Sequence, residues 1–156
     1  MKLITNAVLD ELCQKAAASP RRRLNLNIHP ELDDPIQRLF VAACPDSYFR
    51  PHRHKPETAL VVRGRFDLLT FDDEGQVLER LELGPQAEML GFELEAGVWH
   101  TWVSLSDDAI LFETKAGPYT HLTEADFAPW APAEGAAAVP AFLQRLRAAR
   151  PGDSLA

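Results

Sequence analysis

Residues 51–64 read PHRHKPETALVVRG and place two histidines ahead of an apolar, β-branched run. His52 and His54 are two residues apart, so their side chains share one face if this segment is a strand. Two imidazoles on one face can ligate the same metal ion. Glu57 would fall on the other face of a regular strand. Pro56 cannot pair in a sheet ladder, however, so we expect a kink that returns Glu57 to the histidines.

The sequence around this stretch predicts a succession of short strands. Alternation of apolar and polar residues indicates strands at 23–29 and 37–43, and β-rich segments continue from residue 48 to 115. Turn-forming residues separate these segments at 64, 72–75, 84–85, 95–97 and 106–108. Such spacing is typical of an all-β sandwich or barrel. His100 follows one of these turns at the start of a strand, where it could complete the metal site.

A helix is expected on each side of the barrel. Residues 6–18 carry an apolar stripe at helical spacing, with Asn6 as the expected N-cap and Ser19-Pro20 as the stop. Residues 140–149 show the same spacing, with a proline in the first turn. We therefore expect a single domain over residues 1–156, with a barrel core at about residues 23–115 between the two helices.

These features resemble the two sequence motifs of the cupins. The first motif pairs His-x-His with a Glu and, six residues later, a Gly, and it is matched by His52, His54, Glu57 and Gly64. The second contains Gly-x-x-His, matched by Gly97 and His100, although Glu95 replaces the usual proline and Ser104 the usual asparagine. The gap between His54 and Glu57 is also shorter than in most of the family. The resemblance covers about residues 40–115.

The resemblance implies a mainly β, jelly-roll-type barrel that binds one divalent metal ion. It implies His52, His54 and His100 as ligands and Glu57 as the fourth, with water completing a three-histidine site if Glu57 does not reach. Two or three imidazoles with one carboxylate suit Fe, Zn, Mn or Ni. The sequence does not choose among these metals.

A narrower resemblance is to the WbuC family of cupin-fold metalloproteins, named for members in O-antigen gene clusters. The stretches that carry it are RLNLNIH at 23–29, QR at 37–38, PHRH at 51–54, WH at 99–100, GPY at 117–119 and FAPWAP at 127–132. This resemblance spans nearly the whole chain. It implies a link to lipopolysaccharide biosynthesis, but it names a fold and a metal site more firmly than a reaction.

Polar residues alternate along the first predicted strand. Arg23, Asn25, Asn27 and His29 share one face, and the apolar residues between them are expected to pack in the core. The polar face either meets water or lines the mouth of a cavity that holds a polar ligand. In the second case Arg23, Asn25 and Asn27 are candidate substrate-binding residues. His29 is then a candidate proton carrier.

Strand parity indicates further cavity residues. Tyr48 and Arg50 share parity with the first two histidines and could donate a proton and hold an anion, with a surface loop as the alternative. Trp102 could form a flat wall for a sugar ring, although a core aromatic is the commoner case. Glu113 and Lys115 share one face of the last strand. A surface ion pair is the simpler account of them, and Lys115 is a third candidate proton carrier.

Charge and composition narrow the expected partners to a small molecule. The formal net charge of −7 and a pI near 5.2 argue against nucleic acid or an anionic membrane, because both favour cationic surfaces. We interpret the basic run at 21–23 as a solvated stretch. Two cysteines without a CxxC pattern, and no long apolar segment, predict a reduced cytoplasmic protein. A homodimer paired through sheet edges is also expected.

Three functions are compatible with these residues. The first is a metal-dependent isomerase or epimerase acting on a small polar metabolite, a sugar or sugar nucleotide, with Tyr48, His29 or Lys115 as proton carrier. The second is an Fe(II)-dependent oxygenase of a small molecule. The third is a non-catalytic cupin that binds a small ligand. Fold alone does not decide among them.

Overall fold

The computed structural model describes residues 1–156 and contains eight strands and three helical segments. The helical segments are α1 (Asn6–Ala18), the single turn η1 (Glu124–Asp126) and α2 (Val139–Ala148). The strands are β1 (Arg23–Asn27), β2 (Ile36–Ala43), β3 (Glu57–Arg63), β4 (Phe66–Phe71), β5 (Val77–Leu83), β6 (Gly91–Leu94), β7 (Trp99–Ser104) and β8 (Ala109–Ala116). The predicted helices and turns are confirmed, with bounds that shift by a residue or two.

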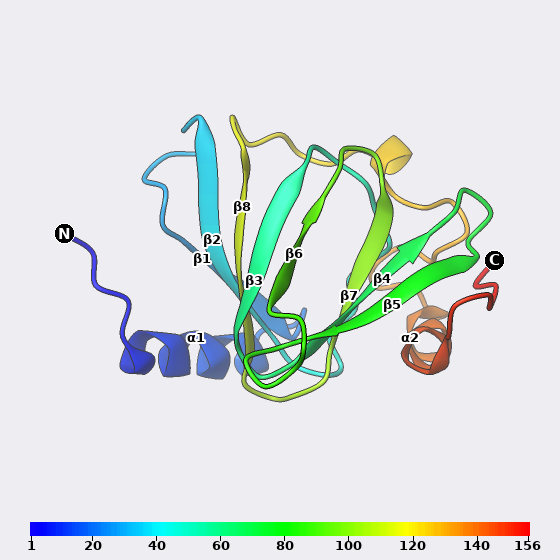
Figure 1. Cartoon of the computed structure of the whole chain (residues 1–156), viewed down its shortest axis with the longest axis horizontal. Coiled ribbons are helices and arrows are strands. Elements are labelled where there is room, and N and C mark those ends of the chain that lie inside the picture. Colours follow the sequence, from blue (N-terminus) through cyan, green and yellow to red (C-terminus); the bar gives the residue numbers. More distant parts are fainter.

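The strands form two antiparallel sheets (Figure 1). The larger sheet has the order β1-β2-β8-β3-β6, and the smaller has the order β5-β4-β7. Burial alternates along β3, so one face of the larger sheet is turned inward. The core between the sheets contains Leu39, Val41, Ala59, Val61, Phe66, Leu68, Trp102 and Leu111. The predicted mainly β barrel is confirmed.

Each long helix covers the outer face of one sheet. Leu12 and Ala16 of α1 pack on Phe40 of β2 and Ile110 of β8. α2 buries its apolar stripe, including Leu146, against the smaller sheet. Figure 1 shows the two helices at opposite ends of the molecule. None of the helices has the length and apolar character needed to cross a membrane.

Thr5, rather than Asn6, caps α1. The Thr5 backbone is extended, and its Oγ1 accepts a hydrogen bond from Val8 N at 3.3 Å. The prediction of Asn6 as the N-cap is therefore wrong. Asn6 is already helical, and its Oδ1 accepts a hydrogen bond from Arg63 at 3.2 Å. The helix ends at Ser19, as expected.

Strand β7 distributes its side chains between two cores and thereby positions the site. Trp102 belongs to the core between the sheets, whereas Trp99 belongs to the cluster that α2 covers. His100 is two residues before Trp102, so it shares the inward face. Its exposed fraction is 2%.

Candidate metal centre and its cavity

Three histidines meet where an irregular segment crosses β7. His52 N donates to His100 O at 3.0 Å, and His100 N donates to His52 O at 2.9 Å. The ring centroids of His52 and His54 lie 4.5 and 4.9 Å from that of His100. His52 forms only isolated bridges, so the prediction of a regular strand through the two histidines is wrong. Tertiary backbone hydrogen bonds, rather than strand parity, bring these imidazoles together.

Backbone carbonyls fix the tautomer of all three imidazoles. The distances are 2.9 Å from His52 Nδ1 to Arg50 O, 2.6 Å from His54 Nδ1 to Lys55 O, and 2.8 Å from His100 Nδ1 to Val98 O. A carbonyl oxygen only accepts, so each Nδ1 carries the proton and donates it. In the neutral ring the lone pair then lies on Nε2, where a metal ion binds. One ligand atom from each ring lies within 4.8 Å of the others.

Glu57 joins this group from the first position of β3. Its Oε2 lies 3.3 Å from Nε2 of His54, and its Oε1 lies 3.3 Å from Nε2 of His100. Glu57 Oε1 and His100 Nε2 are buried and have no hydrogen-bond partner. Two lone pairs therefore face each other, which a cation between them would stabilise. Glu57 faces the histidines as expected, but residues 53–56 form no strand, so β3 begins at Glu57 instead of being kinked at Pro56.

The electrostatics of the group favour the metal-ligating forms of His52 and Glu57, but the protonated form of His54. Burial, and then the charges of His100 and His54, lower the pKa of His52 to about 3, so its ring is neutral. Burial also lowers the pKa of His54, but the hydrogen bond and charge of Glu57 outweigh it and raise that pKa. Burial raises the pKa of Glu57, whereas its contacts with His100 and His54 hold it well below the ordinary value. At His54 a metal ion would therefore compete with a proton, whereas at His52 it would not.

A buried ion pair from β8 adjoins Glu57. Lys115 Nζ lies 2.5 Å from Glu113 Oε1 and 3.9 Å from Glu57 Oε2. The exposed fraction of Glu113 is 7%, so the account of this pair as a surface ion pair is wrong. The β3–β8 register places Lys115 directly opposite Glu57. Both charged side chains of β8 therefore point into the interior beside the candidate ligands.

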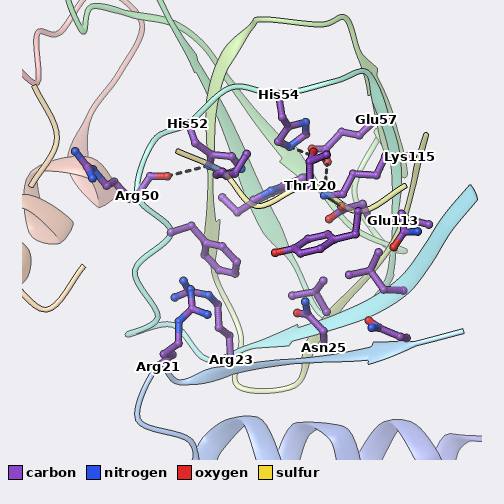
Figure 2. A pocket seen from close by; sticks show the side chains of 18 of the residues that line it. Arg21, Arg23, Asn25, Arg50, His52, His54, Glu57, Glu113, Lys115 and Thr120 are labelled. Carbon is purple, nitrogen blue, oxygen red and sulfur yellow. Dashed lines mark hydrogen bonds and ion pairs between the residues drawn. The ribbon is translucent and has the colours of Figure 1, made fainter. Parts of the chain in front are cut away.

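Three of the candidate ligands, His52, His54 and Glu57, line a cavity of about 700 Å³. Arg23, Asn25 and Asn27 of β1 line it, as do Arg50, Trp102, Glu113 and Lys115. Figure 2 shows Arg23 and Asn25 across the cavity from the imidazoles. The polar face of β1 thus lines the cavity, and Asn25 and Asn27 remain exposed to solvent there. Arg50 stacks on Phe127, with its guanidinium carbon 4.9 Å from the ring centroid, and pairs with Glu124 at 2.9 Å.

The apolar residues of β1 depart from the expected pattern at one position. Leu24 is 37% exposed and lines the cavity, so the expectation that it packs in the core is wrong. β1 is the edge strand of its sheet, and only Leu26 and Ile28 reach the cluster beneath α1. An edge strand has a neighbour on one side only, which leaves its end open to the cavity.

Two predicted proton carriers lie outside the cavity lining. The Tyr48 hydroxyl donates to Pro132 O at 2.9 Å, and its ring packs in the cluster beneath α2. Its parity argument fails because residues 44–51 form no strand. His29 is buried beyond the end of β1, where its Nδ1 accepts a hydrogen bond from Arg38 N at 3.0 Å. Of the three candidates, only Lys115 lines the cavity.

Sequence reasoning missed Arg21 and Glu134, which also line the cavity. Arg21 binds Glu134, which is 113 residues away in the sequence, so no local spacing could have linked them. The interpretation of the 21–23 run as a solvated stretch is wrong for Arg23. Its side chain is only 10% exposed. The one sequence feature that could have indicated this group was Arg23 itself, a basic residue at the start of a predicted polar strand face.

The fold and the histidine cluster together define a class of protein. The chain has a mainly β, two-sheet cupin fold with three histidines that could hold a metal ion. A family model described as Domain of unknown function (DUF6016) matches residues 4–83, and the chain belongs to this family. No curated protein matches the sequence.

Three solved structures illustrate the likeness in fold. KdgF from Halomonas sp. is 18% identical with a TM-score of 0.50, over 65% of this chain and 84% of that chain. An oxalate oxidase in complex with the substrate analogue glycolate is 12% identical with a TM-score of 0.53, over 67% and 56%. A mutant of Bacillus subtilis oxalate decarboxylase is 14% identical with a TM-score of 0.51, over 69% and 28%. At these identities the likeness shows the fold alone.

Proposed function

We propose that this protein is a metal-dependent cupin enzyme that acts on a small polar metabolite of the sugar or sugar-nucleotide class. The observation that carries the proposal is the convergence of three imidazole Nε2 atoms and the Glu57 carboxylate beside a cavity whose wall includes several charged and amide side chains. The Nδ1–H groups of the three imidazoles donate to backbone carbonyls, so the Nε2 atoms carry the lone pairs that can bind a metal ion. This set suits Fe, Zn, Mn or Ni.

The cavity walls support a ligand that carries several hydroxyl groups. Asn25 and Asn27 have amides that both donate and accept hydrogen bonds, as hydroxyl groups require. Trp102 contributes aromatic surface on which the apolar face of a sugar ring can pack. The resemblance of this sequence to the WbuC family supports a place in O-antigen polysaccharide biosynthesis.

Lys115 is the proposed proton carrier of an isomerase or epimerase reaction. A bound divalent ion would supply Lewis-acid polarisation of a substrate carbonyl. Burial lowers the pKa of Lys115, but the charges of Glu113 and Glu57 outweigh it and raise that pKa, so Nζ carries a proton. The ammonium can deliver this proton to a substrate oxygen within the cavity. Glu113, at 2.5 Å, holds the ammonium in position.

The proposal is tested first by metal content. Untagged protein purified without chelator would be analysed by mass spectrometry beside His52→Ala, His100→Ala and His121→Ala. We expect about one metal ion per chain in the wild type and in His121→Ala, because His121 is an exposed residue outside the cluster. Both cluster variants should lose the ion. A wild type that binds no metal even after reconstitution would refute the proposal.

The reaction is tested on the metal-loaded protein. A panel of nucleotide sugars and keto sugars would be assayed for isomerisation with wild type and Lys115→Met. Turnover that disappears in Lys115→Met while metal content is unchanged would support the assigned proton role. Oxygen uptake with the Fe(II) form would instead identify an oxygenase, and a ligand recovered unchanged would identify a binding protein.

A further inference from the structure

Two arginines line the cavity at the end away from the histidines. Arg21 donates through Nε and Nη2 to the two carboxylate oxygens of Glu134, at 2.8 and 2.9 Å. Arg23 donates through Nη2 to Glu134 Oε2 at 3.0 Å. All three side chains line the cavity that His52 and His54 also line. Figure 2 shows Arg21 and Arg23 together at one end and the imidazoles at the other.

The guanidinium of Arg23 is built into the cavity wall. Its side chain is 10% exposed, and Nη1 donates to Tyr48 O at 2.7 Å. Its guanidinium carbon lies 4.5 Å from the centroid of the Phe49 ring. Burial, and then the charge of Arg21, lower the pKa of Arg23. A buried cation of this kind is costly unless an anion lies beside it.

The backbone between the two arginines is strained. Arg22 has a φ of +56°, a left-handed conformation that is unfavourable for a residue with a Cβ. Its side chain pairs with Asp46 at 3.0 Å and does not line the cavity. Arg21 and Arg23 are thereby left to converge on one carboxylate. Strained conformations of this kind are concentrated at ligand sites.

Glu134 occupies this place from a loop rather than from a regular element. It lies in the connector before α2, and its side chain is 38% exposed. The next residue, Gly135, has a φ of +83° and no atom within 4 Å of the position that a Cβ would take. Its ion pair with Arg21, whose side chain is 62% exposed, contributes little to stability, whereas the buried Arg23 requires some anion at this place. Another anion can therefore replace Glu134 without disturbing the fold.

We propose that Arg21 and Arg23 form a subsite for an anionic group of the ligand, a carboxylate or a phosphate, and that Glu134 occupies the subsite until the ligand arrives. This rests on the proposed function, because it places the acidic group at the end of the substrate remote from the metal. It narrows the substrate to an acidic or phosphorylated sugar-like molecule. It also makes Glu134 an internal competitor.

The test titrates the metal-free chain of residues 1–156 with inorganic phosphate and, separately, with malonate at constant ionic strength. NMR signals of the Nε–H groups of Arg21 and Arg23 report binding. We expect saturable shifts with a dissociation constant of about 1 mM in the wild type. Glu134→Gln should bind about tenfold more tightly, because it removes the competing charge. Glu74→Gln makes the same charge change on an exposed hairpin residue and should leave the affinity unchanged.

Two arginine variants complete the design. Arg23→Gln and Arg21→Gln should each weaken anion binding by about tenfold or more. Arg21 is 62% exposed, so its variant keeps the test valid if Arg23→Gln does not fold. Saturation by phosphate alone would identify a phosphate subsite, and saturation by malonate alone a carboxylate subsite. No saturable shift in Glu134→Gln, or equal tightening in Glu74→Gln, would overturn the proposal.

Metal analysis of the same variants, after reconstitution with metal, separates this proposal from the proposed function. If the protein binds no metal but Glu134→Gln binds phosphate more tightly than the wild type, the proposed function is refuted and the anion subsite is supported. If the protein binds metal but Glu134→Gln has no effect on anion affinity, the anion subsite is refuted and the metal-dependent function is supported.

Discussion

Replacing Glu57 by glutamine tests whether its carboxylate is the fourth metal ligand. The side chain is 3% exposed, and each oxygen lies 3.3 Å from an imidazole Nε2. Glutamine keeps the volume but removes the charge, and its amide nitrogen cannot ligate. Removal of a side chain that hydrogen-bonds to a metal ligand lowers metal affinity about 10- to 100-fold as a rule. Removal of a ligand itself should therefore lower the affinity by about 100-fold. At about 1.4 kcal/mol per tenfold, this corresponds to about 2.8 kcal/mol.

Glu113→Gln is the matched control for this change. Glu113 is buried and pairs with Lys115, as Glu57 does, but its ion pair is with Lys115 alone and not with a histidine. Its loss should therefore change metal affinity by less than about tenfold, through charge alone. Affinities would be measured by competition with a chromogenic chelator at fixed pH. Equal affinities of Glu57→Gln and the wild type would refute the assignment and leave a three-histidine site completed by water.

Three further predictions concern pH and stability. The pKa of His54 is raised above its ordinary value of about 6.5, so metal affinity should rise with pH through that region and level off once the ring is neutral. His52, with a pKa of about 3, adds no pH dependence there. An affinity from chelator competition that stays constant between about pH 5.5 and 8.5 would contradict this. Leu146→Ala should cost about 3 kcal/mol in urea unfolding, because Leu146 is fully buried between α2 and the smaller sheet. Gly64→Ala should cost more than Gly135→Ala, whose loss we place at about 1 kcal/mol: both have positive φ, but only at Gly64 would the new Cβ approach the Cα of the first β8 residue, to 2.8 Å. Equal unfolding free energies of the two glycine variants would show that the backbone conformation, and not the contact, sets the cost.

The elements of the fold were predictable because each leaves a local pattern. A sheet buried on one face imposes a period of two on its strands, and hairpins need residues that tolerate tight turns. The turns at 64 and 72–75 accordingly lie between β3, β4 and β5, as expected. The cap of α1 was not decided by pattern, because Thr5 and Asn6 are adjacent and both are suitable caps. Only the backbone geometry distinguishes them.

Strand parity failed wherever the chain left regular geometry. It placed Tyr48 in the cavity, but the segment before His52 is held by hydrogen bonds to distant loops rather than by a ladder. It succeeded for Lys115, which lies on a regular strand and faces Glu57 in register. Parity is thus informative only where the ladder continues through the residue in question.

Contacts between distant segments were beyond any local pattern. Glu134 reaches Arg21 and Arg23 because the connector before α2 returns to the start of β1. No sequence pattern near residue 134 predicts this contact. The burial of Glu113 was likewise set by the position of β8 between β2 and β3, which gives it a neighbour on both sides. Such residues become visible only when the sheet order is known.

Hydrogen bonds of the main chain orient the candidate metal ligands. Two of its imidazoles, those of His52 and His100, bond through Nδ1 to carbonyls two residues earlier, so their tautomer follows from the local backbone. The reciprocal hydrogen bonds between the same two residues fix the separation of their backbones. His100 lies on the inward face of β7 and is 2% exposed, whereas His52 and His54 are half-buried. Substitution of His52 or His54, which are half-buried, should therefore reduce metal binding much more than stability. Truncation of the buried His100 also leaves a cavity, so the unfolding free energy of His100→Ala has to be measured beside its metal content.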